Sequence, residues 1–347
     1  MKKRFFRRVG HRTVWLAVLL MLCACGSHPA DPSATEQRGW TLKEIPLPSG
    51  YTVDPMEIPE YDPERDAIRC YAFTTRNEGG TILHENRCYT VQTDGTILEE
   101  ADISIAPTER VTLAVFGEET DFFVSVDSDP KARRYALCKR NTETGELQSV
   151  LLTQYYPDGE KPEPDFMTAD PDGDLYIGIG KALLLFDMDL GYLKTMTFPG
   201  KEFTYRTLGR SADGEIFLST TWSLTSEDGV SLSLVDKTVD QVGYGSQFNS
   251  IDAIPAFPHV SDGTGNFYAW SEAGLWRMTP GAANQYHAEQ TADFAAENLR
   301  FSKGKRKAGY SWIALPVRDD FFLCTKCKMR EGIAVADLCV LSNGEES

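Results

Sequence analysis

The sequence is poor in features that mark several common classes of protein. Its apolar run near the start, Val14–Leu22, is too short to span a bilayer, which takes a helix of about 20 apolar residues. Only 5 histidines occur among 347 residues, and 35 basic residues stand against 51 acidic ones, giving a formal net charge of −16. The scattered histidines disfavour a metal site, and the acidic balance repels phosphate backbones. We therefore expect no metal and no nucleic-acid partner.

The first residues carry a targeting signal. Six basic residues precede the short apolar run, and the run ends in Leu22-Cys23-Ala24-Cys25. The pattern resembles a bacterial lipoprotein signal, whose cysteine is acylated and becomes the first mature residue. The resemblance implies that residues 1–24 are a signal peptide. It further implies that Cys25 carries the lipid anchor and that palmitate is one of the attached acyl chains. It also implies a lipid-anchored protein on the extracytoplasmic face of the cell membrane. An ordinary secretory signal is the alternative.

Cleavage before Cys25 changes the charge of the chain. Six basic residues and no acidic residue leave with the signal, so the formal charge moves from −16 to −22. So acidic a body is repelled by an anionic membrane, and attachment depends on the lipid. The polar, proline-containing stretch after Cys25 predicts a flexible tether over residues 25–38. Residues 39–347 then form the folded domain.

The folded domain contains a repeat. Six segments begin with a polar residue and continue with apolar or aromatic ones, and their starts lie 41 to 55 residues apart. Many follow a turn with Asp or Gly, which suits a tight hairpin. The segments are Asp66–Tyr71, Asp121–Val126, Asp174–Ile179, Glu215–Thr220, Asn266–Ser271 and Asp320–Thr325.

Each segment is followed by a second predicted strand, and several units show a strand upstream or a fourth one downstream. Four strands per unit indicate an all-β fold, a six-bladed β-propeller with antiparallel blades. The last unit lacks a fourth strand, and Trp40–Pro48 is expected to supply it and close the ring. Seven blades would need a unit that the sequence does not show. A β-sandwich or a solenoid would also give repeated hairpins.

The cysteines suggest two cross-strand pairs. Aligning each hairpin about its turn places Cys70 opposite Cys88 and Cys324 opposite Cys339. Directly opposed residues of an antiparallel pair lie close enough for a disulfide, and an extracytoplasmic location permits oxidation. The alternative is that these cysteines are small apolar core residues.

No catalytic motif is found, and we expect no catalytic residue and no cofactor. The acidic stretch Asp170–Asp174 fits a turn better than a calcium loop, because Leu175 stands where a calcium loop needs glycine. Candidate ligand-binding residues are aromatic side chains on long connections or near strand ends, where recognition is common. They are Tyr155 and Tyr156 on one such connection, and Trp222 and Trp270, which would otherwise cover blade edges.

The signal, the tether and the acidic repeats together resemble propeller lipoproteins of Gram-positive bacteria. In some of those, a similar propeller precedes an extracellular solute-binding domain of an ABC importer. The resemblance implies a membrane-anchored binding or assembly module associated with solute uptake. Its partner would be a protein, or a small sugar or peptide ligand. The alternative is a propeller enzyme that acts on glycans or peptides at the cell surface.

Overall fold

The computed structural model describes residues 39–343, except 56–58, 63, 130–133, 157–162, 181, 199–202, 211–214, 225–226, 243–245, 249–256, 262–265, 271–273, 281–285, 294–309 and 319. The predicted signal peptide, the tether and Cys25 therefore lie outside the described residues. Over the described part, no helix is both long enough and apolar enough to cross a membrane.

The described chain is built almost entirely of antiparallel strands. One sheet joins the two ends of the domain: β1 (Trp40–Glu44), β2 (Thr52–Val53), β3 (Glu60–Asp62), β4 (Ala67–Glu78), β5 (Thr81–Gln92), β6 (Ile97–Ile103), β23 (Tyr310–Arg318), β24 (Phe321–Arg330) and β25 (Ile333–Asn343).

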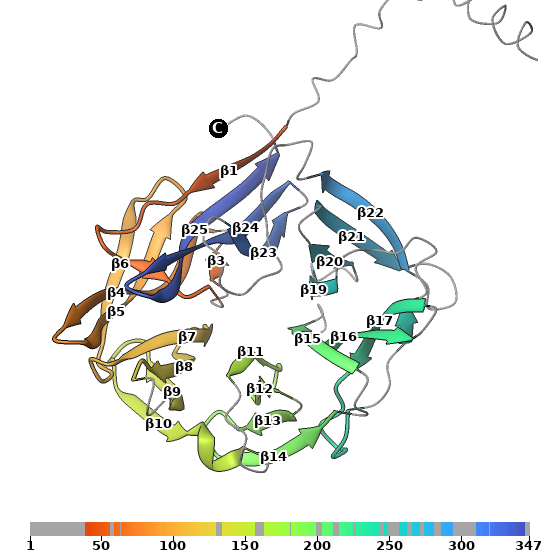
Figure 1. The fold of residues 1–347 in the computed structure, drawn as a ribbon, viewed down its shortest axis with the longest axis horizontal. Coiled ribbons are helices and arrows are strands. Elements are labelled where there is room, and N and C mark those ends of the chain that lie inside the picture. Colours follow the sequence, from red (N-terminus) through yellow and green to blue (C-terminus); the bar gives the residue numbers. More distant parts are fainter. Residues whose placement is uncertain are drawn as a thin grey trace, which may run out of the picture. The chain divides into compact units, whose positions relative to one another are not determined.

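Four further sheets have four strands each and follow one another in the chain (Figure 1). The first has β7 (Glu109–Val115), β8 (Thr120–Asp127), β9 (Tyr135–Asn141) and β10 (Leu147–Leu151), and the 3-10 helix η1 (Leu152–Tyr155) follows it. The second has β11 (Pro164–Ala169), β12 (Leu175–Ile179), β13 (Ala182–Phe186) and β14 (Tyr192–Thr197). The third has β15 (Phe203–Arg210), β16 (Ile216–Leu224), β17 (Glu227–Leu234) and β18 (Ser246–Phe248). The fourth has β19 (Phe257–Ser261), β20 (Phe267–Trp270), β21 (Gly274–Pro280) and β22 (Tyr286–Asp293).

The repeated segments of the sequence become equivalent strands. All six fall in the second strand of a unit, namely β4, β8, β12, β16, β20 and β24. The third residue of each segment is large and at most 2% exposed, which explains why an apolar residue recurs there. These residues are Ile68, Phe123, Tyr176, Phe217, Tyr268 and Phe322. The strand repeat that the sequence predicts is thus confirmed.

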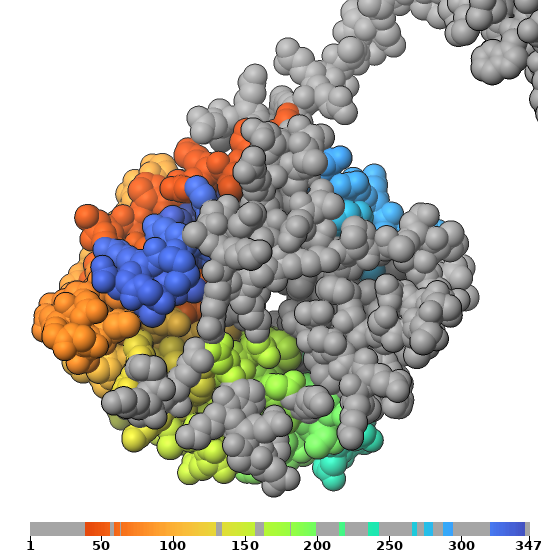
Figure 2. Space-filling model, in the orientation of Figure 1, coloured from red at the N-terminus to blue at the C-terminus, as the bar shows by residue number. Residues whose placement is uncertain are grey.

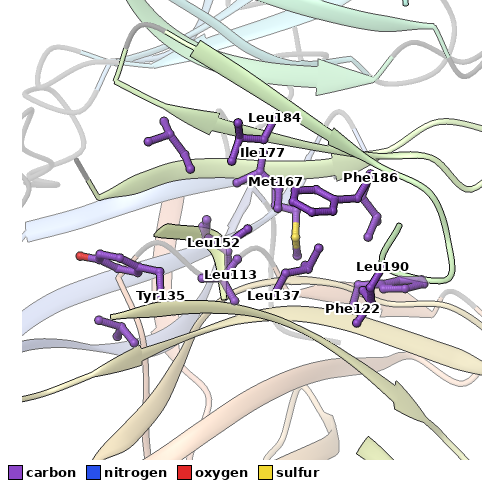
Figure 3. Close-up of a cluster of buried hydrophobic side chains, with 14 residues drawn as sticks. Leu113, Phe122, Tyr135, Leu137, Leu152, Met167, Ile177, Leu184, Phe186 and Leu190 are labelled. Carbon is purple, nitrogen blue, oxygen red and sulfur yellow. The ribbon is translucent and has the colours of Figure 1, made fainter. Parts of the chain in front are cut away.

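The core lies between neighbouring sheets. Figure 3 shows one such cluster, in which Leu113, Phe122 and Leu137 from β7–β9 meet Met167, Ile177 and Phe186 from β11–β13. The face of one sheet therefore packs on the face of the next, as sheets do when their inward residues interdigitate. The first strands continue this order, because β7 contacts β11, β11 contacts β15, and β15 contacts β19.

The first described strand pairs with the last. Strand β1 lies antiparallel to β25, with Trp40 opposite Asn343 and Glu44 opposite Cys339. Figure 2 shows the C-terminal strands directly beside the N-terminal ones. Trp40 is 7% exposed and packs on Phe322 with a ring-centroid distance of 5.6 Å. The predicted pairing of this N-terminal strand with the last unit is therefore observed.

Candidate functional site

A cleft of about 570 Å³ opens beside the β4–β6 strands and the turns of the β7–β10 sheet. Its walls come from β3 and the start of β4, from the adjoining parts of β5 and β6, and from the end of β9 with the turns that precede β8 and follow β9. Polar side chains dominate the lining, and none of the lining residues is aromatic. The lining residues are Glu60, Asp62, Arg65, Ala67, Arg69, Cys88, Thr90, Glu99, Glu100, Ala101, Glu118, Arg140, Thr142 and Glu143.

The arginines of the cleft converge on one buried carboxylate. The side chain of Asp121 is 0% exposed, and its Oδ2 accepts hydrogen bonds from Arg69 Nη2 at 2.8 Å and from Tyr71 Oη at 2.9 Å. Arg140 Nη1 lies 3.4 Å from the same oxygen, and the Gly117 amide donates to Oδ1 at 3.3 Å. Burial raises the pKa of Asp121, although the guanidinium groups oppose that shift. This carboxylate fixes two arginines at the base of the cleft.

Arg69 is held along the edge and on one face of its guanidinium. Its Nη1 donates to the Gly117 carbonyl at 2.9 Å, and its plane lies over the Phe116 ring at 5.2 Å from the centroid. Tyr71 stacks on the same Phe116 ring, with centroids 5.3 Å apart. A planar, stacked and doubly hydrogen-bonded guanidinium has little freedom left to lose when a ligand binds. Arg69 is therefore organised before binding.

Arg140 is buried but incompletely satisfied. Its side chain is 6% exposed, and its Nε has no hydrogen-bond partner among the described residues. A buried donor without an acceptor costs about 1–3 kcal/mol, so native proteins seldom leave one. The Arg140 side chain thus brings a buried donor without a described acceptor to the wall of the cleft.

The rim of the cleft is acidic. Six carboxylates line it against three guanidinium groups. Arg65 pairs with Glu99 at 2.7 Å, and Glu100 pairs with Arg87, which lies outside the lining. Glu60 lies 4.0 Å from Arg69, and burial raises the pKa of the Glu60 carboxyl. The remaining excess of negative charge gives the opening a preference for cations.

The cleft does not carry an obvious nucleophile. Burial raises the pKa of the Cys88 thiol to about 12, so the reactive thiolate is scarce at neutral pH. Within its lining there is no histidine to act as a general base.

The predicted aromatic residues lie apart from this cleft. Tyr155 stacks on Tyr192 at 4.5 Å and meets Phe186 edge-on, so it packs against the core. Tyr156 is half-buried beside the same core cluster, and burial raises the pKa of its hydroxyl. Trp222 lies in β16 opposite Gly229, and Trp270 lies in β20 opposite Leu275. The side chains of both tryptophans lie outside the described residues.

The two cysteine pairs differ in register. Cys324 stands directly opposite Cys339, as the sequence predicts. Cys70 instead faces Tyr89, and Cys88 faces Tyr71, because the turn at Gly79-Gly80 sets the β4–β5 pairing one residue away from the predicted one. A shift of one residue sends a side chain to the other face of the sheet. Cys70 and Cys88 accordingly belong to different core clusters, so their predicted opposition is wrong.

The acidic turn Asp170–Asp174 holds a cation from the chain itself. Lys237 Nζ lies 3.0, 2.9 and 2.7 Å from the carboxylates of Asp170, Asp172 and Asp174. These contacts join the β11–β14 sheet to the turn after β17. Over the described residues, no group of three or more histidines, cysteines or carboxylates is placed to hold a metal ion. The turn is therefore a contact between sheets.

A serine–histidine contact joins the start of β5 to the residue that follows β8. Ser128 Oγ lies 2.7 Å from His84 Nε2, while His84 Nδ1 lies 3.3 Å from the Thr74 carbonyl. A carbonyl only accepts, which favours the tautomer with the proton on Nδ1, where Nε2 accepts from the serine hydroxyl. The Thr75 hydroxyl, which can donate or accept, also lies 3.3 Å from Nδ1. The Ser128 amide donates to the Thr108 carbonyl, and the Asp129 amide donates to Asp127 Oδ1. Neither amide is available to stabilise an oxyanion.

Sequence reasoning missed the arginines of the cleft, although one of them carries a signal. Arg69 occupies the fourth position of its repeat segment, where the other five units have apolar residues. These are Val124, Ile177, Leu218, Ala269 and Leu323. A charge at a position that is apolar in every other copy of a repeat indicates a local role. Arg140 has no comparable signal, because its place in the cleft depends on how two sheets pack.

Comparisons with known proteins bear on the fold. No protein-family model matches the sequence, and no curated protein matches it. Among solved structures, a luciferin-regenerating enzyme is 11% identical over 88% of this chain and 96% of its own, with a TM-score of 0.50. A gluconolactonase from Xanthomonas campestris is 10% identical over 92% of this chain and 100% of its own (TM-score 0.48). The β-propeller domain of the trilobed protease from Pyrococcus furiosus is 8% identical over 87% of this chain and 85% of its own (TM-score 0.46). Identities this low concern the fold alone. Within the chain itself, the successive four-stranded antiparallel sheets agree with the β-propeller that the sequence predicts.

Proposed function

We propose that this chain is a membrane-anchored, extracytoplasmic binding module. In this proposal it is a six-bladed propeller, with β1 as the outer strand of the last blade and the ring closed by the β1–β25 pairing. Cys25 carries the lipid, and residues 26–38 connect it to the propeller. The support for anchoring is the pattern of basic, apolar and cysteine residues at the start of the sequence.

One observation carries the binding role. Arg140 lines the cleft with a side chain that is 6% exposed, and its Nε lacks an acceptor within the described part of the chain. Arg69 is fixed beside it by Asp121, Gly117 and Phe116. Donors that are positioned in advance in a concave, polar lining are what a small polar solute needs. The ligand in this proposal is a small solute taken up by the cell.

Binding is tested by thermal denaturation with a panel of sugars and short peptides. The informative variant is Glu118→Gln/Glu143→Gln, because both residues are exposed and line the cleft. Its control is Glu119→Gln/Glu146→Gln, which changes equally exposed carboxylates outside the lining. We expect at least one compound to raise the Tm of the wild type and of the control, and to act more weakly on the cleft variant. If no compound shifts the wild-type Tm, or if the cleft variant responds as the wild type does, the binding role is wrong.

Anchoring is tested separately by fractionating cells that express the full chain. Acylation of Cys25 predicts that the protein pellets with membranes and that Cys25→Ala releases it. The matched control is Cys23→Ala, which leaves the proposed acylation site intact. A Cys25→Ala protein that still pellets with membranes would contradict the lipid anchor.

The alternative, an enzyme that acts on glycans or peptides, is favoured by the contact between Ser128 and His84. The histidine is oriented by a backbone carbonyl and accepts from the hydroxyl, as a general base does. Hydrolysis of chromogenic ester, peptide and glycoside substrates by the wild type, abolished in Ser128→Ala, would establish it. The occupied amides beside Ser128 favour the binding module instead.

A further inference from the structure

We infer that the ligand of the cleft is a short basic peptide, with its cationic side chain at the acidic rim and a backbone carbonyl at Arg140. This inference rests on the proposed binding function and specifies the chemistry of the ligand. Three features of the lining carry it: carboxylates without a cation, a buried donor without an acceptor, and the absence of aromatic rings.

The first feature is the set of rim carboxylates that no cation satisfies. Arg69 and Arg140 are engaged by Asp121, and Arg65 by Glu99. Glu118 and Glu143 are exposed, and neither forms an ion pair within the described residues. Among the described residues, Asp62 accepts only the backbone amides of Glu64 and Arg65. The cleft therefore presents negative charge from two sheets that an ammonium or guanidinium group would balance.

The second feature is the donor at the base. Arg140 Nε calls for an oxygen acceptor, while the lining as a whole is negatively charged. A carboxylate of the ligand would be repelled by the six carboxylates of the lining, whereas a neutral carbonyl of the ligand would not. A peptide carbonyl supplies that oxygen, and a blocked peptide lacks the terminal carboxylate that the rim would repel. The combination of a cation and a neutral carbonyl distinguishes a basic peptide from a simple amine.

The third feature separates peptides from sugars. Sugar-binding sites commonly stack a ring face on an aromatic side chain, and the lining of this cleft has none. Phe116 lies under Arg69 and is covered by it. A volume of about 570 Å³ falls within the usual range for small ligands, so a peptide of a few residues fits and a folded partner does not.

The test is isothermal titration of the mature chain with blocked dipeptides. Acetyl-dilysine amide is compared with acetyl-diglycine amide, acetyl-diglutamate amide, putrescine and glucosamine. We expect acetyl-dilysine amide to bind at least tenfold more tightly than each of the others, and to weaken as ionic strength rises. Glu118→Gln/Glu143→Gln should weaken it about tenfold, while Glu119→Gln/Glu146→Gln leaves it unchanged.

The outcomes separate the inference from the function on which it rests. If the neutral dipeptide, the acidic dipeptide, putrescine or glucosamine binds as well as the basic dipeptide, the basic-peptide inference is wrong and a binding cleft stands. Equal affinity of the wild type and the Glu118→Gln/Glu143→Gln variant for acetyl-dilysine amide also overturns the inference, because the peptide then binds elsewhere. If no compound of the set binds, both the inference and the proposed binding role are contradicted.

Discussion

Trp40 Nε1 donates a hydrogen bond to the carbonyl of Thr291 at 3.1 Å, although 251 residues separate them in the chain. Trp40 belongs to β1 and Thr291 to β22, so one side chain ties the first described strand to a sheet with which β1 does not pair. Its ring also packs in a cluster with Tyr268, Leu275 and Phe322. The N-terminal strand is thus fixed by its backbone to one sheet and by its tryptophan to another.

Replacing this tryptophan should loosen the junction. Trp40→Ala removes a side chain of a residue that is only 7% exposed, and losses of about 3–5 kcal/mol are typical of such truncations. Trp40→Phe keeps most of the packing and loses the indole hydrogen bond, which costs about 1 kcal/mol. Urea denaturation measures the free energy of unfolding of both variants. Thr41→Ala, at the next and exposed position, is the control and should change the free energy of unfolding little. Equal stability of Trp40→Ala and wild type would show that β1 is not held as described.

The strand pattern was open to prediction, whereas the cleft was not. Each segment such as Asp121–Val126 carries a local pattern: a polar residue at a turn, then a short, mostly apolar run that suits a strand buried on both faces. The register of β4 and β5 depends on the location of a two-residue turn at Gly79-Gly80, where φ is +61° and +91°. The sequence offers several glycine and asparagine positions near that turn, so the predicted register was wrong by one residue. Asp121 and Arg140 meet Arg69 only because two sheets pack, which no local pattern encodes.

The register of the last hairpin predicts a selective disulfide. Cys324 and Cys339 are direct partners on β24 and β25, so mild oxidation should join them. Cys70 and Cys88 lie on opposite faces and should not be joined to each other. Peptide mapping by mass spectrometry under non-reducing conditions distinguishes the two pairs. A loop of this length predicts about 3 kcal/mol of stabilisation, and Cys324→Ser should abolish it. Recovery of a Cys70–Cys88 peptide from folded protein would contradict the register.

The contacts of Lys237 predict a stability effect that depends on pH. Burial acts to raise the pKa of Asp170, but hydrogen bonds from Lys237 and Tyr176 outweigh it and hold that pKa below its usual value. A carboxyl whose pKa is lower in the folded state stabilises above its unfolded pKa, and this stability is lost as pH falls through the folded pKa. Lys237→Ala should therefore lower stability at neutral pH, by about 1 kcal/mol for a partly exposed cluster, and less at about pH 3.

The matched comparison for Lys237 is Lys139, which also bridges two sheets but contacts one carboxylate, Asp189, at 2.7 Å. Denaturation of Lys237→Ala and Lys139→Ala at pH 7 and pH 3 measures both effects. The loss in Lys237→Ala should be the larger one at pH 7 and should shrink more on acidification. Identical losses at both pH values would mean that the three carboxylates contribute nothing through charge.

His84 predicts a pH dependence that arises from a buried neutral base. Burial lowers the pKa of His84 from its usual 6.5, so the folded protein favours the neutral ring. Protons then bind the unfolded chain more readily, and this residue destabilises the fold increasingly as pH falls below 6.5. His84→Gln removes the titrating group while retaining polarity. Between pH 7 and pH 5, the stability of the wild type should fall relative to that of His84→Gln.

The effect of His84 shows only in the difference in stability between the wild type and His84→Gln, because the pKa shifts of other groups change stability with pH in the opposite direction. Burial also raises the pKa of Glu60 and Glu109, and these carboxyls favour the fold as pH falls. Their contribution is common to both proteins and cancels in the difference. Ser128→Ala, which removes the hydroxyl on His84 but not the ring, should retain the pH dependence of the wild type. A stability difference that does not change between pH 7 and pH 5 would contradict the buried neutral histidine.

The pairing of β1 with β25 has a consequence for the order in which the chain folds. Thr41 and Ser342 are partners 301 residues apart, so β1 is synthesised early and waits for the last strand before its backbone is satisfied. Until then the edge of a nascent sheet stays open to pairing with other chains. Contacts of such sequence separation form slowly, because the ends of a long loop must first meet. Truncation near the C-terminus would therefore leave a chain whose earliest strand never finds its partner, and aggregation during synthesis is the expected result.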